Sequence, residues 1–405
     1  MKAVILAAGE GTRMRPLTKD TPKPLIPVAG KPMIQHNIDK IEDKVEEIII
    51  VAGYKIEQFE DKYCDNENIK IVEQSEALGT ADAALQARDL IDEKALVLNG
   101  DDIYGNLEKL VEKDSAVLAS KAEKPENYGV FKVEDGNVEG IVEKPDNPPS
   151  SLVNTGAYVV KEDFFDLLEK VEKSARGEYE ITDALEDYLD SEEVELVKTD
   201  MWLPCSYPWQ LIDANEELIE EEVGTGRING KVSENAVIEK NVVVEKGAEI
   251  KQFTTVEGPA IIKSGAEVGS NGYIRPGTVL EENVKIGDSE IKNSVVRESS
   301  SIPHKSYIGD SYIGKKVNIG AGSQTANLRN DNSTVKMKVK GRLMDTGREK
   351  FGTVIGSEAK IGVNNSVKPG RKIGFGAVTD AGEKIAENLS NKAVMKDGEI
   401  IEDRN

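Results

Sequence analysis

The chain has 405 residues and a formal net charge of −22 at pH 7, from 52 Lys and Arg against 74 Asp and Glu. One hydrophobic core rarely serves a chain of that length, so we expect two domains. The acidity argues against a nucleic-acid partner, because binding a phosphate backbone requires a basic surface. No apolar run approaches ~18 residues, and no charged leader precedes Ala3–Ala8, so we expect no membrane contact. The two cysteines, Cys64 and Cys205, lack metal-ligand spacing and fit a reducing cytoplasm.

Short apolar runs alternate with helical stretches through the first half of the chain. In chain order we expect strands and helices at Ala3–Ala8, Met33–Ile41, Glu47–Ala52, Ala81–Leu90 and Ala95–Asn99, then at Ala116–Ser120, Val130–Val133, Val153–Val160 and Thr182–Leu189. This rhythm is typical of βαβ units. It predicts an α/β fold class, with a Rossmann-like domain built on a mixed, mostly parallel sheet. A last helix over Trp209–Glu222 ends at Gly224–Gly226, a boundary that divides the chain into domains 1–222 and 223–405.

Beyond that boundary an aliphatic residue recurs at every sixth position. The series is Val232, Ile238, Val244, Ile250, Val256, Ile262, Val268, Ile274, Leu280 and Ile286, with small residues four places after many of them. One aliphatic and one small residue per hexapeptide suit a three-sided coil, which predicts a left-handed parallel β-helix of hexapeptide repeats followed by a C-terminal tail. The frame slips near Lys292 and recovers at Ile302.

The longest interruption of the repeat, Ser323–Thr353, is basic in an acidic chain. It holds seven basic and three acidic residues. Within it, Val335–Lys340 alternates strictly between apolar residues and lysine, so the lysines share one face of a strand. A solvated edge protected by lysine and an anion-binding face are both open interpretations.

The segment Leu6–Leu17 contains glycines where the first strand is expected to end. Gly9 and Gly11 let backbone N–H groups approach a phosphate, and Arg13 supplies charge. Met14 stands where the third glycine of the dinucleotide fingerprint belongs, and no Walker A lysine follows. The loop alone is a weak indication of a phosphate site.

The continuation Thr21–Pro27, with Lys23 between two prolines, resembles the signature of sugar-1-phosphate nucleotidylyltransferases. Further matching motifs follow in order: EQSEALGT around Gln74, LNGDD around Asp101, Glu143–Pro145, Asn154–Gly156 and Glu178–Asp183. The resemblance implies that Lys23 and Arg13 are catalytic. It also implies a nucleotide site at Ala8, Gly9, Gly11, Thr12, Arg13, Gln74, Gly79 and Thr80, a sugar-phosphate site at Gly129, Glu143 and Asn154, and Mg²⁺ on Asp101.

Such enzymes join a sugar 1-phosphate to the α-phosphorus of a nucleoside triphosphate and expel pyrophosphate, which requires positioning and charge neutralisation. The sequence departs from the family where a second metal ligand is usual, because Pro204 stands there. Asp200, Asp102 and the oxygens of the triphosphate are the open alternatives.

His304 is one of two histidines and lies at a frame slip of the repeat, where a side chain can leave the coil. Its ordinary titration range suits a general base near neutral pH. His36, by contrast, falls in an apparent amphipathic helix, and we interpret it as structural or exposed.

The stretch around His304 is similar to the acetyltransferase site of the bifunctional N-acetylglucosamine-1-phosphate uridylyltransferase/glucosamine-1-phosphate acetyltransferase family, including its archaeal members. The resemblance implies that His304 deprotonates the 2-amino group of a hexosamine 1-phosphate for attack on acetyl-CoA. Arg275, Lys292, Tyr307, Asn327 and Lys336 would then bind sugar phosphate or acetyl-CoA. Leu328 stands where the bacterial enzymes have tyrosine.

Both resemblances together predict a cytoplasmic bifunctional enzyme that makes UDP-N-acetylglucosamine, with Mg²⁺, acetyl-CoA and UTP or dTTP as partners, and a homotrimer or a multiple of it. Two alternatives stay open. One is transfer of a uridylyl or thymidylyl group to glucose 1-phosphate, with the β-helix as a scaffold. The other is a non-catalytic subunit that binds nucleotide-sugars, which Pro204 favours.

Overall fold

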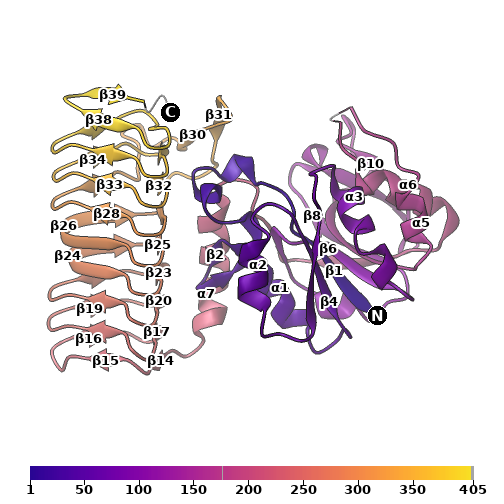
Figure 1. Ribbon diagram of the computed structural model, residues 1–405, viewed down its shortest axis with the longest axis horizontal. Coiled ribbons are helices and arrows are strands. Elements are labelled where there is room, and N and C mark those ends of the chain that lie inside the picture. The colour runs from indigo at the N-terminus through magenta and orange to yellow at the C-terminus, as the bar shows by residue number, and fades with distance from the viewer. Residues whose placement is uncertain (176, 403–405) are drawn as a thin grey trace. The chain divides into compact units, whose positions relative to one another are not determined.

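The computed structural model describes residues 1–175 and 177–402 (Figure 1). The last three residues of the expected tail lie outside these ranges. The chain forms two compact units, and each unit is made of segments that are not contiguous in the sequence. The first contains Met1–Glu10, Pro22–Leu25 and Pro32–Pro204, and the second Gly11–Thr21, Ile26–Lys31 and Cys205–Asn405. None of the helices in the described ranges is long and apolar enough to cross a membrane.

The first unit is built on a nine-stranded mixed sheet. Its order is β5 (Ile69–Glu73), β4 (Ile48–Ala52), β1 (Lys2–Leu6), β6 (Ala95–Asn99), β11 (Leu152–Val160), β8 (Ala116–Lys121), β12 (Glu195–Thr199), β10 (Asn137–Glu143) and β9 (Gly129–Glu134). A separate antiparallel pair joins β7 (Asp102–Tyr104) to β13 (Trp202–Pro204). Of the two short strands near the N-terminus, β2 (Pro27–Val28) belongs to the second unit and β3 (Lys31–Pro32) lies where the chain passes from the second unit to the first.

Helices cover both faces of this sheet. They are α1 (Met33–Ile41), α2 (Glu57–Tyr63), α3 (Thr80–Leu85), α4 (Leu107–Leu110), α5 (Phe164–Leu168) and α6 (Ile181–Ser191). Alternate side chains of β1 point to opposite faces, so Ile5 joins the core under α1 and α2, and Val4 joins the core under α3, α5 and α6. The central strands are therefore apolar on both sides.

Two expectations for this unit need correction. The sheet is mixed, but parallel pairing is confined to β5, β4, β1 and β6 and to β12 with β8, so "mostly parallel" was wrong. Strand β11 enters antiparallel between β6 and β8, which apolar runs alone do not reveal. The helix expected over Ala81–Leu90 also divides into α3 and a 3₁₀ turn at Arg88–Leu90.

The second unit contains a solenoid of short strands stacked in chain order, parallel except for the last strand, which pairs antiparallel with its neighbour (Figure 1). One sheet contains β14 (Arg227–Ile228), β17 (Val242–Val244), β20 (Ala260–Ile262), β23 (Thr278–Leu280), β25 (Val295–Val296), β27 (Tyr312–Ile313), β32 (Thr353–Ile355) and β35 (Arg371–Ile373). The other strands are β15 (Lys231–Val232), β16 (Val237–Ile238), β18 (Glu249–Ile250), β19 (Thr255–Val256), β21 (Glu267–Val268), β22 (Tyr273–Ile274), β24 (Lys285–Lys292), β26 (Ser301–Gly309), β28 (Asn318–Ile319), β29 (Gln324–Thr325), β33 (Lys360–Ile361), β34 (Ser366–Val367), β36 (Val378–Thr379), β37 (Lys384–Ile385), β38 (Val394–Lys396) and β39 (Glu399–Ile401).

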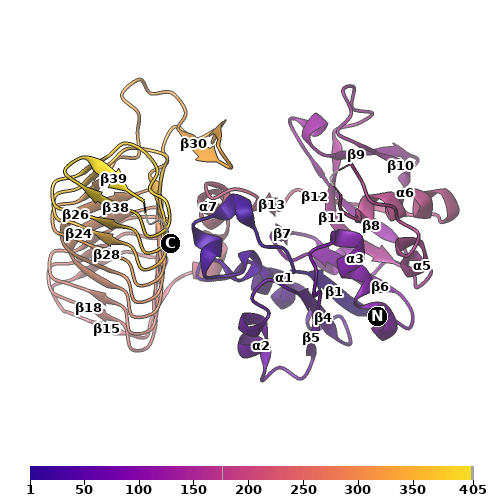
Figure 2. The ribbon, with the colours of Figure 1, turned by 45° about the horizontal axis from the view of Figure 1, so that its top comes forward.

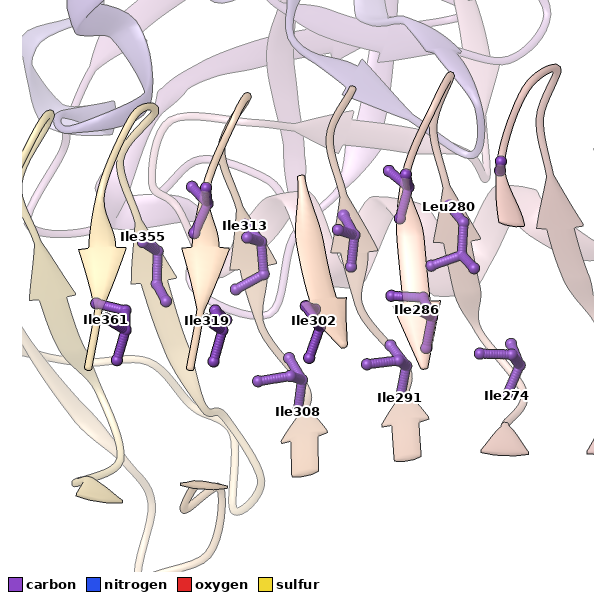
Figure 3. Packing of buried hydrophobic residues seen from close by; sticks show 14 of the residues in the cluster. Ile274, Leu280, Ile286, Ile291, Ile302, Ile308, Ile313, Ile319, Ile355 and Ile361 are labelled. Carbon is purple, nitrogen blue, oxygen red and sulfur yellow. The ribbon is translucent and has the colours of Figure 1, made fainter. Parts of the chain in front are cut away.

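The hexapeptide spacing sets the register of these coils. Val244 pairs with Ile262, and Ile262 with Leu280, so each of these first coils adds 18 residues (262 minus 244). The aliphatic residues of the series point inward and form one continuous core, part of which Figure 3 shows from Ile274 to Ile361. The expected frame slip is confirmed. Ile286 pairs with Ile302, and the strands there lengthen to eight and nine residues in β24 and β26.

A helix and a hairpin are added to the coils of the second unit. Helix α7 (Gln210–Val223) belongs to the second unit, where the side chain of Asn215 donates to the carbonyl of Gly277. The interruption of the repeat forms an antiparallel hairpin of β30 (Lys336–Val339) and β31 (Arg342–Asp345), which Figure 2 shows outside the stack of coils.

Two candidate functional sites

In the first unit, Lys23 and Asp101 form an ion pair, as the signature led us to expect for residues of one site. Lys23 Nζ donates to Asp101 Oδ2. The lysine side chain is 8% exposed and the aspartate side chain 37%. Asp101 follows the carboxyl end of β6, where ligands usually bind in open α/β sheets. A buried ammonium and a half-exposed carboxylate thus lie together at that edge.

The residues expected to read the base also come together. Gln74 follows β5, and its side-chain amide donates to the carbonyl of Gly79 at 3.1 Å and to Asp82 Oδ2 at 2.7 Å. A Cβ on Gly79 would lie 2.3 Å from the carbonyl oxygen of Tyr179, so only glycine fits there. Thr80 accepts a hydrogen bond from the amide of Ile181 at 3.0 Å.

Of the expected sugar-phosphate residues, Gly129 and Glu143 are partners across β9 and β10. A Cβ on Gly129 would lie 3.2 Å from Glu143 Oε2. Asn154 lies on β11, exchanges hydrogen bonds with the hydroxyl of Tyr158 at 2.8 and 2.9 Å, and accepts one from the amide of Gly156. Glu143 pairs with Lys144 at 2.7 Å.

The glycine-rich loop is divided between the units. Ala8 and Gly9 belong to the first, whereas Gly11, Thr12 and Arg13 belong to the second. Gly11 adopts a left-handed conformation with φ 60° before the 3₁₀ turn of Thr12–Met14. Arg13 lies over the ring of Tyr207 at 5.9 Å.

Few protein side chains lie where they could bind the metal expected on Asp101. No group of three His, Cys, Asp or Glu side chains suited to a metal occurs among the described residues. Pro204 pairs with Asp102 across β13 and β7, and Asp102 is 8% exposed with its carboxylate accepting from the indole of Trp202 at 3.3 Å. A single half-exposed carboxylate still fits Mg²⁺, which is commonly held by one or two carboxylates together with substrate phosphates.

In the second unit, Arg275 and Tyr307 of the expected acetyltransferase site meet around Glu290 of β24. Arg275 donates to Glu290 Oε1 at 2.8 Å, and its Nε is buried without a hydrogen-bond partner among the described residues. Glu290 pairs with Tyr307 of β26 across the ladder. A buried guanidinium N–H with no acceptor suits an incoming anion.

Lys292 and Asn327 are joined by a residue that the sequence did not single out, Asp310, and Tyr307 is linked to them through Asn327. Lys292 Nζ donates to both carboxylate oxygens of Asp310 at 3.0 Å, and Asn327 Nδ2 donates to Oδ2. Asn327 Nδ2 also donates to the hydroxyl of Tyr307 at 3.1 Å. Burial and the Asp310 charge raise the pKa of Tyr307, while the hydrogen bond from Asn327 opposes them. The phenol is therefore neutral at physiological pH.

His304 lies on the same strand as Tyr307, and its side chain is 69% exposed. Its Nδ1 is 3.7 Å from Asp288 Oδ1, on the neighbouring coil. The carboxylate can stabilise an imidazolium that has accepted a proton. His36, in contrast, is buried in α1 at 3% exposure, which confirms its structural interpretation.

The lysine face of the hairpin is confirmed. Lys336 and Lys338 are exposed on β30, and Met337 and Val339 between them are buried. Arg348 does not add to this cationic face, because it pairs with Asp213 and Glu216 of α7. Leu328 bridges to Lys350 and is 42% exposed.

The sequence reasoning missed Asp288, Glu290 and Asp310. Asp310 could have been noticed from its position just after Ile308, at the return of the hexapeptide frame, where a buried acidic residue is unusual.

Each half of the chain matches a known protein family model. Residues 2–221 match the family model described as nucleotidyl transferase, and residues 256–361 match the one described as GMPPB C-terminal domain. A solved structure titled as a putative glucose-1-phosphate thymidylyltransferase from Bacillus anthracis shares 29% identity, with a TM-score of 0.49, over 53% of this chain and 94% of its own. The first match spans more than half of the chain, so the chain belongs to the nucleotidyl transferase family.

Several relatives match this chain over nearly its whole length. "Bifunctional protein GlmU" of Methanocaldococcus jannaschii is 42% identical over 406 residues, 99% of either chain. The "Bifunctional sugar-1-phosphate nucleotidylyltransferase/acetyltransferase" of Sulfurisphaera tokodaii is 38% identical over 92% of this chain and 94% of its own. "Bifunctional protein GlmU" of Thermotoga sp. is 30% identical over 100% of this chain and 99% of its own. Within its family, the chain thus belongs with the bifunctional GlmU proteins.

Proposed function

We propose that the chain makes UDP-N-acetylglucosamine in two reactions. The second unit transfers an acetyl group from acetyl-CoA to glucosamine 1-phosphate, and the first transfers UMP from UTP to the N-acetylated product. The observation that carries the proposal is full-length similarity to proteins named bifunctional, in a chain that has both the Lys23–Asp101 pair and the cluster around Asp310.

In uridylyl transfer, an oxygen of the sugar phosphate attacks the α-phosphorus of UTP, and the bond to the pyrophosphate oxygen breaks. No protein nucleophile is needed, and catalysis depends on positioning and charge neutralisation. Lys23 would contact the phosphates and offset developing negative charge, and Arg13 would assist it. Gln74, Gly79 and Thr80 would hold the base, while Gly129, Glu143 and Asn154 would hold the sugar phosphate. Asp101 would hold Mg²⁺, which supplies further neutralisation of phosphate charge when it is bound.

In acetyl transfer, the 2-amino nitrogen attacks the thioester carbonyl carbon and the C–S bond breaks. His304 would accept the proton that the amine loses, and Asp288 would stabilise the resulting imidazolium. The departing sulfur takes up a proton to leave as free CoA thiol. Arg275 and Lys292 would bind the sugar phosphate, Tyr307 and Asn327 would orient the amine, and Lys336 would contact phosphate groups of the sugar or of CoA.

The architecture is consistent with one reaction in each part of the chain. We infer that the solenoid is a left-handed β-helix of hexapeptide repeats, supported by its 18-residue coils (262 minus 244), and that three copies assemble around it. We further infer that nucleotidyl transfer belongs to residues 1–222 and acetyl transfer to 223–405, with helix α7 of the first range packed in the second unit. A free thiol at the exposed Cys64 fits the reducing cytoplasm as the place of action.

Two assays test the proposal on the full chain. Pyrophosphate release is measured with Mg²⁺, UTP and N-acetylglucosamine 1-phosphate, and thiol release with acetyl-CoA and glucosamine 1-phosphate. Lys23→Ala is expected to abolish only the first and His304→Ala only the second, so each variant controls for the folding of the other. Absence of pyrophosphate with four sugar phosphates and both UTP and dTTP would rule out nucleotidyl transfer.

The thiol assay also distinguishes a bifunctional enzyme from one that transfers only nucleotidyl groups. A chain that releases pyrophosphate from UTP or dTTP with glucose 1-phosphate, but never releases thiol, would be a nucleotidylyltransferase whose solenoid is a scaffold. Binding of UDP-N-acetylglucosamine without either turnover would instead identify a regulatory subunit.

A further inference from the structure

Asp310 is the common acceptor of the candidate acetyltransferase site. Its side chain is 2% exposed, and its carboxylate accepts from Lys292, Asn293 and Asn327. Its backbone is fixed as well, because its amide donates to the carbonyl of Lys292 at 2.9 Å and its carbonyl accepts from Gly352 at 2.8 Å. A buried carboxylate must be satisfied by donors on every side, so its neighbours have to turn their N–H groups toward it.

That requirement determines what the neighbours offer to a ligand. Asn327 directs its amide nitrogen to Asp310 and Tyr307, which leaves its carbonyl oxygen as the group turned away from them. Lys292 directs its ammonium group at both oxygens of Asp310, and an ammonium has three N–H donors. The site therefore presents one acceptor, which suits an amine, and one remaining donor, which suits a phosphate.

The network continues to helix α7. Asn293 donates from Nδ2 both to Asp310 Oδ1 at 2.9 Å and to Glu216. Glu216 in turn accepts from Arg348 at 2.6 and 3.0 Å. Arg348 also pairs with Asp213, one turn earlier on α7. Glu216 thus holds the Asn293 amide that helps to satisfy Asp310, although its hydrogen bonds within the described ranges go to Asn293 and Arg348 and to none of the expected substrate residues.

We propose that Asp310 is a positioning residue that sets the donor and acceptor polarity of the acetyl-acceptor site, and that Glu216 on α7 supports it through Asn293. The proposal rests on the acetyltransferase function proposed above and deepens it. It assigns selection for an amino sugar phosphate to the orientation of Asn327, and it makes Glu216, in the middle of α7, a part of the acetyl-transfer machinery.

The test measures thiol release by purified full-length variants while glucosamine 1-phosphate and acetyl-CoA are varied separately. Asp310→Asn can donate as well as accept, so Asn327 is free to reverse its amide. We expect kcat/KM for glucosamine 1-phosphate to fall about 100-fold, as for loss of a charged hydrogen bond. We expect the KM for acetyl-CoA to change less than twofold, and pyrophosphate release to stay at the wild-type rate.

Glu216→Gln keeps the size of the side chain, and its partial exposure makes misfolding of this variant less of a concern. We expect a three- to tenfold fall in kcat/KM for glucosamine 1-phosphate. Asp213→Asn removes the other carboxylate partner of Arg348 without touching Asn293, and Glu217→Gln makes the same change at an exposed position of α7. Both controls are expected to stay within twofold of wild type.

The outcomes are distinguishable. A wild-type chain that releases no thiol overturns the proposed acetyltransferase function and this inference with it. Wild-type thiol release combined with unchanged kcat/KM in Asp310→Asn or Glu216→Gln overturns the inference alone. An equal rise of both KM values together with a lower melting temperature assigns Asp310 a purely structural role, which also contradicts the proposal.

Discussion

Lys23 donates a hydrogen bond to the carboxylate of Asp101, 78 residues away in the chain. The lysine is nearly buried and its carboxylate partner is half-exposed, so the pair holds its cation at an edge that ligands can reach. We predict that Lys23→Met lowers kcat/KM for uridylyl transfer by at least about 100-fold, because a positioned cation at a phosphoryl group contributes about 3 kcal/mol to transition-state stabilisation. Pyrophosphate release measures the loss, and thiol release should stay within twofold.

Asp101→Asn tests the other half of the pair. We expect a comparable loss of uridylyl transfer and a higher Mg²⁺ concentration for half-maximal rate, because an amide is a weaker ligand for a hard cation. Since the two residues contact one another, the double variant should lose less than the product of the single losses. Strict multiplicativity would mean that the contact between them has no part in catalysis.

The candidate residues of this site could be named from the sequence because they lie in motifs that are local in the chain. The solenoid was predictable for a related reason: its core needs one aliphatic side chain per hexapeptide, so Val244, Ile262 and Leu280 follow a fixed period. Pairings between distant segments were not predictable. Nothing near β11 indicates that it inserts antiparallel between β6 and β8.

The same limit explains what was missed in the candidate acetyltransferase site. Asp310 binds Lys292 and Asn327, each about a coil away in the chain, and Glu216 reaches Asn293 across 77 residues. These contacts depend on how coils stack and how α7 packs on them. Glu216 lies on a strongly acidic helix, and a single sequence does not distinguish it from the other acidic residues there.

Gly309 lies beside the groups expected to orient the amine. A Cβ there would lie 2.5 Å from the hydroxyl of Tyr307 and 2.8 Å from Asn327 Nδ2. Gly309→Ala must therefore displace one or both side chains, and we predict a loss of thiol release of at least about tenfold, the effect of misplacing a substrate-positioning group. Gly140→Ala is the control, because nothing lies nearer than 3.8 Å to its Cβ. Unimpaired Gly309→Ala would show that Tyr307 and Asn327 need not hold these positions.

Ile308 is fully buried in the solenoid core, between the coils of Ile291 and Ile319 (Figure 3). We predict that Ile308→Ala lowers the free energy of unfolding of the solenoid by about 2–5 kcal/mol, because rigid coils close poorly over a lost side chain. Val363→Ala is the matched control, since Val363 is 45% exposed, and it should change stability by less than about 0.5 kcal/mol. Chemical denaturation followed by circular dichroism measures both, and equal effects would contradict the packing described here.

Glu281 is a buried carboxyl group on the solenoid. Burial raises its pKa from 4.5 to about 7, opposed by Lys263, whose Nζ is 3.7 Å from Oε1, and by Arg297. Glu282 and Glu298 add to the rise, and Oε1 has no hydrogen-bond partner among the described residues. The folded state therefore binds this proton more tightly than the unfolded state does.

Because the folded pKa lies above the unfolded value, this stabilisation is complete below pH 4.5 and is lost as the pH rises through 7. Glu281→Gln cannot ionise, so we predict that it loses less stability than wild type between about pH 5 and pH 8, by at most about 3 kcal/mol. Urea midpoints of both proteins at the two pH values measure the difference. Exposed Glu234→Gln should follow the wild-type pH dependence. If Glu281→Gln showed the wild-type pH dependence as well, Glu281 would ionise in the folded chain near its ordinary pKa. The attraction of Lys263 would then fully offset the effect of burial on this pKa.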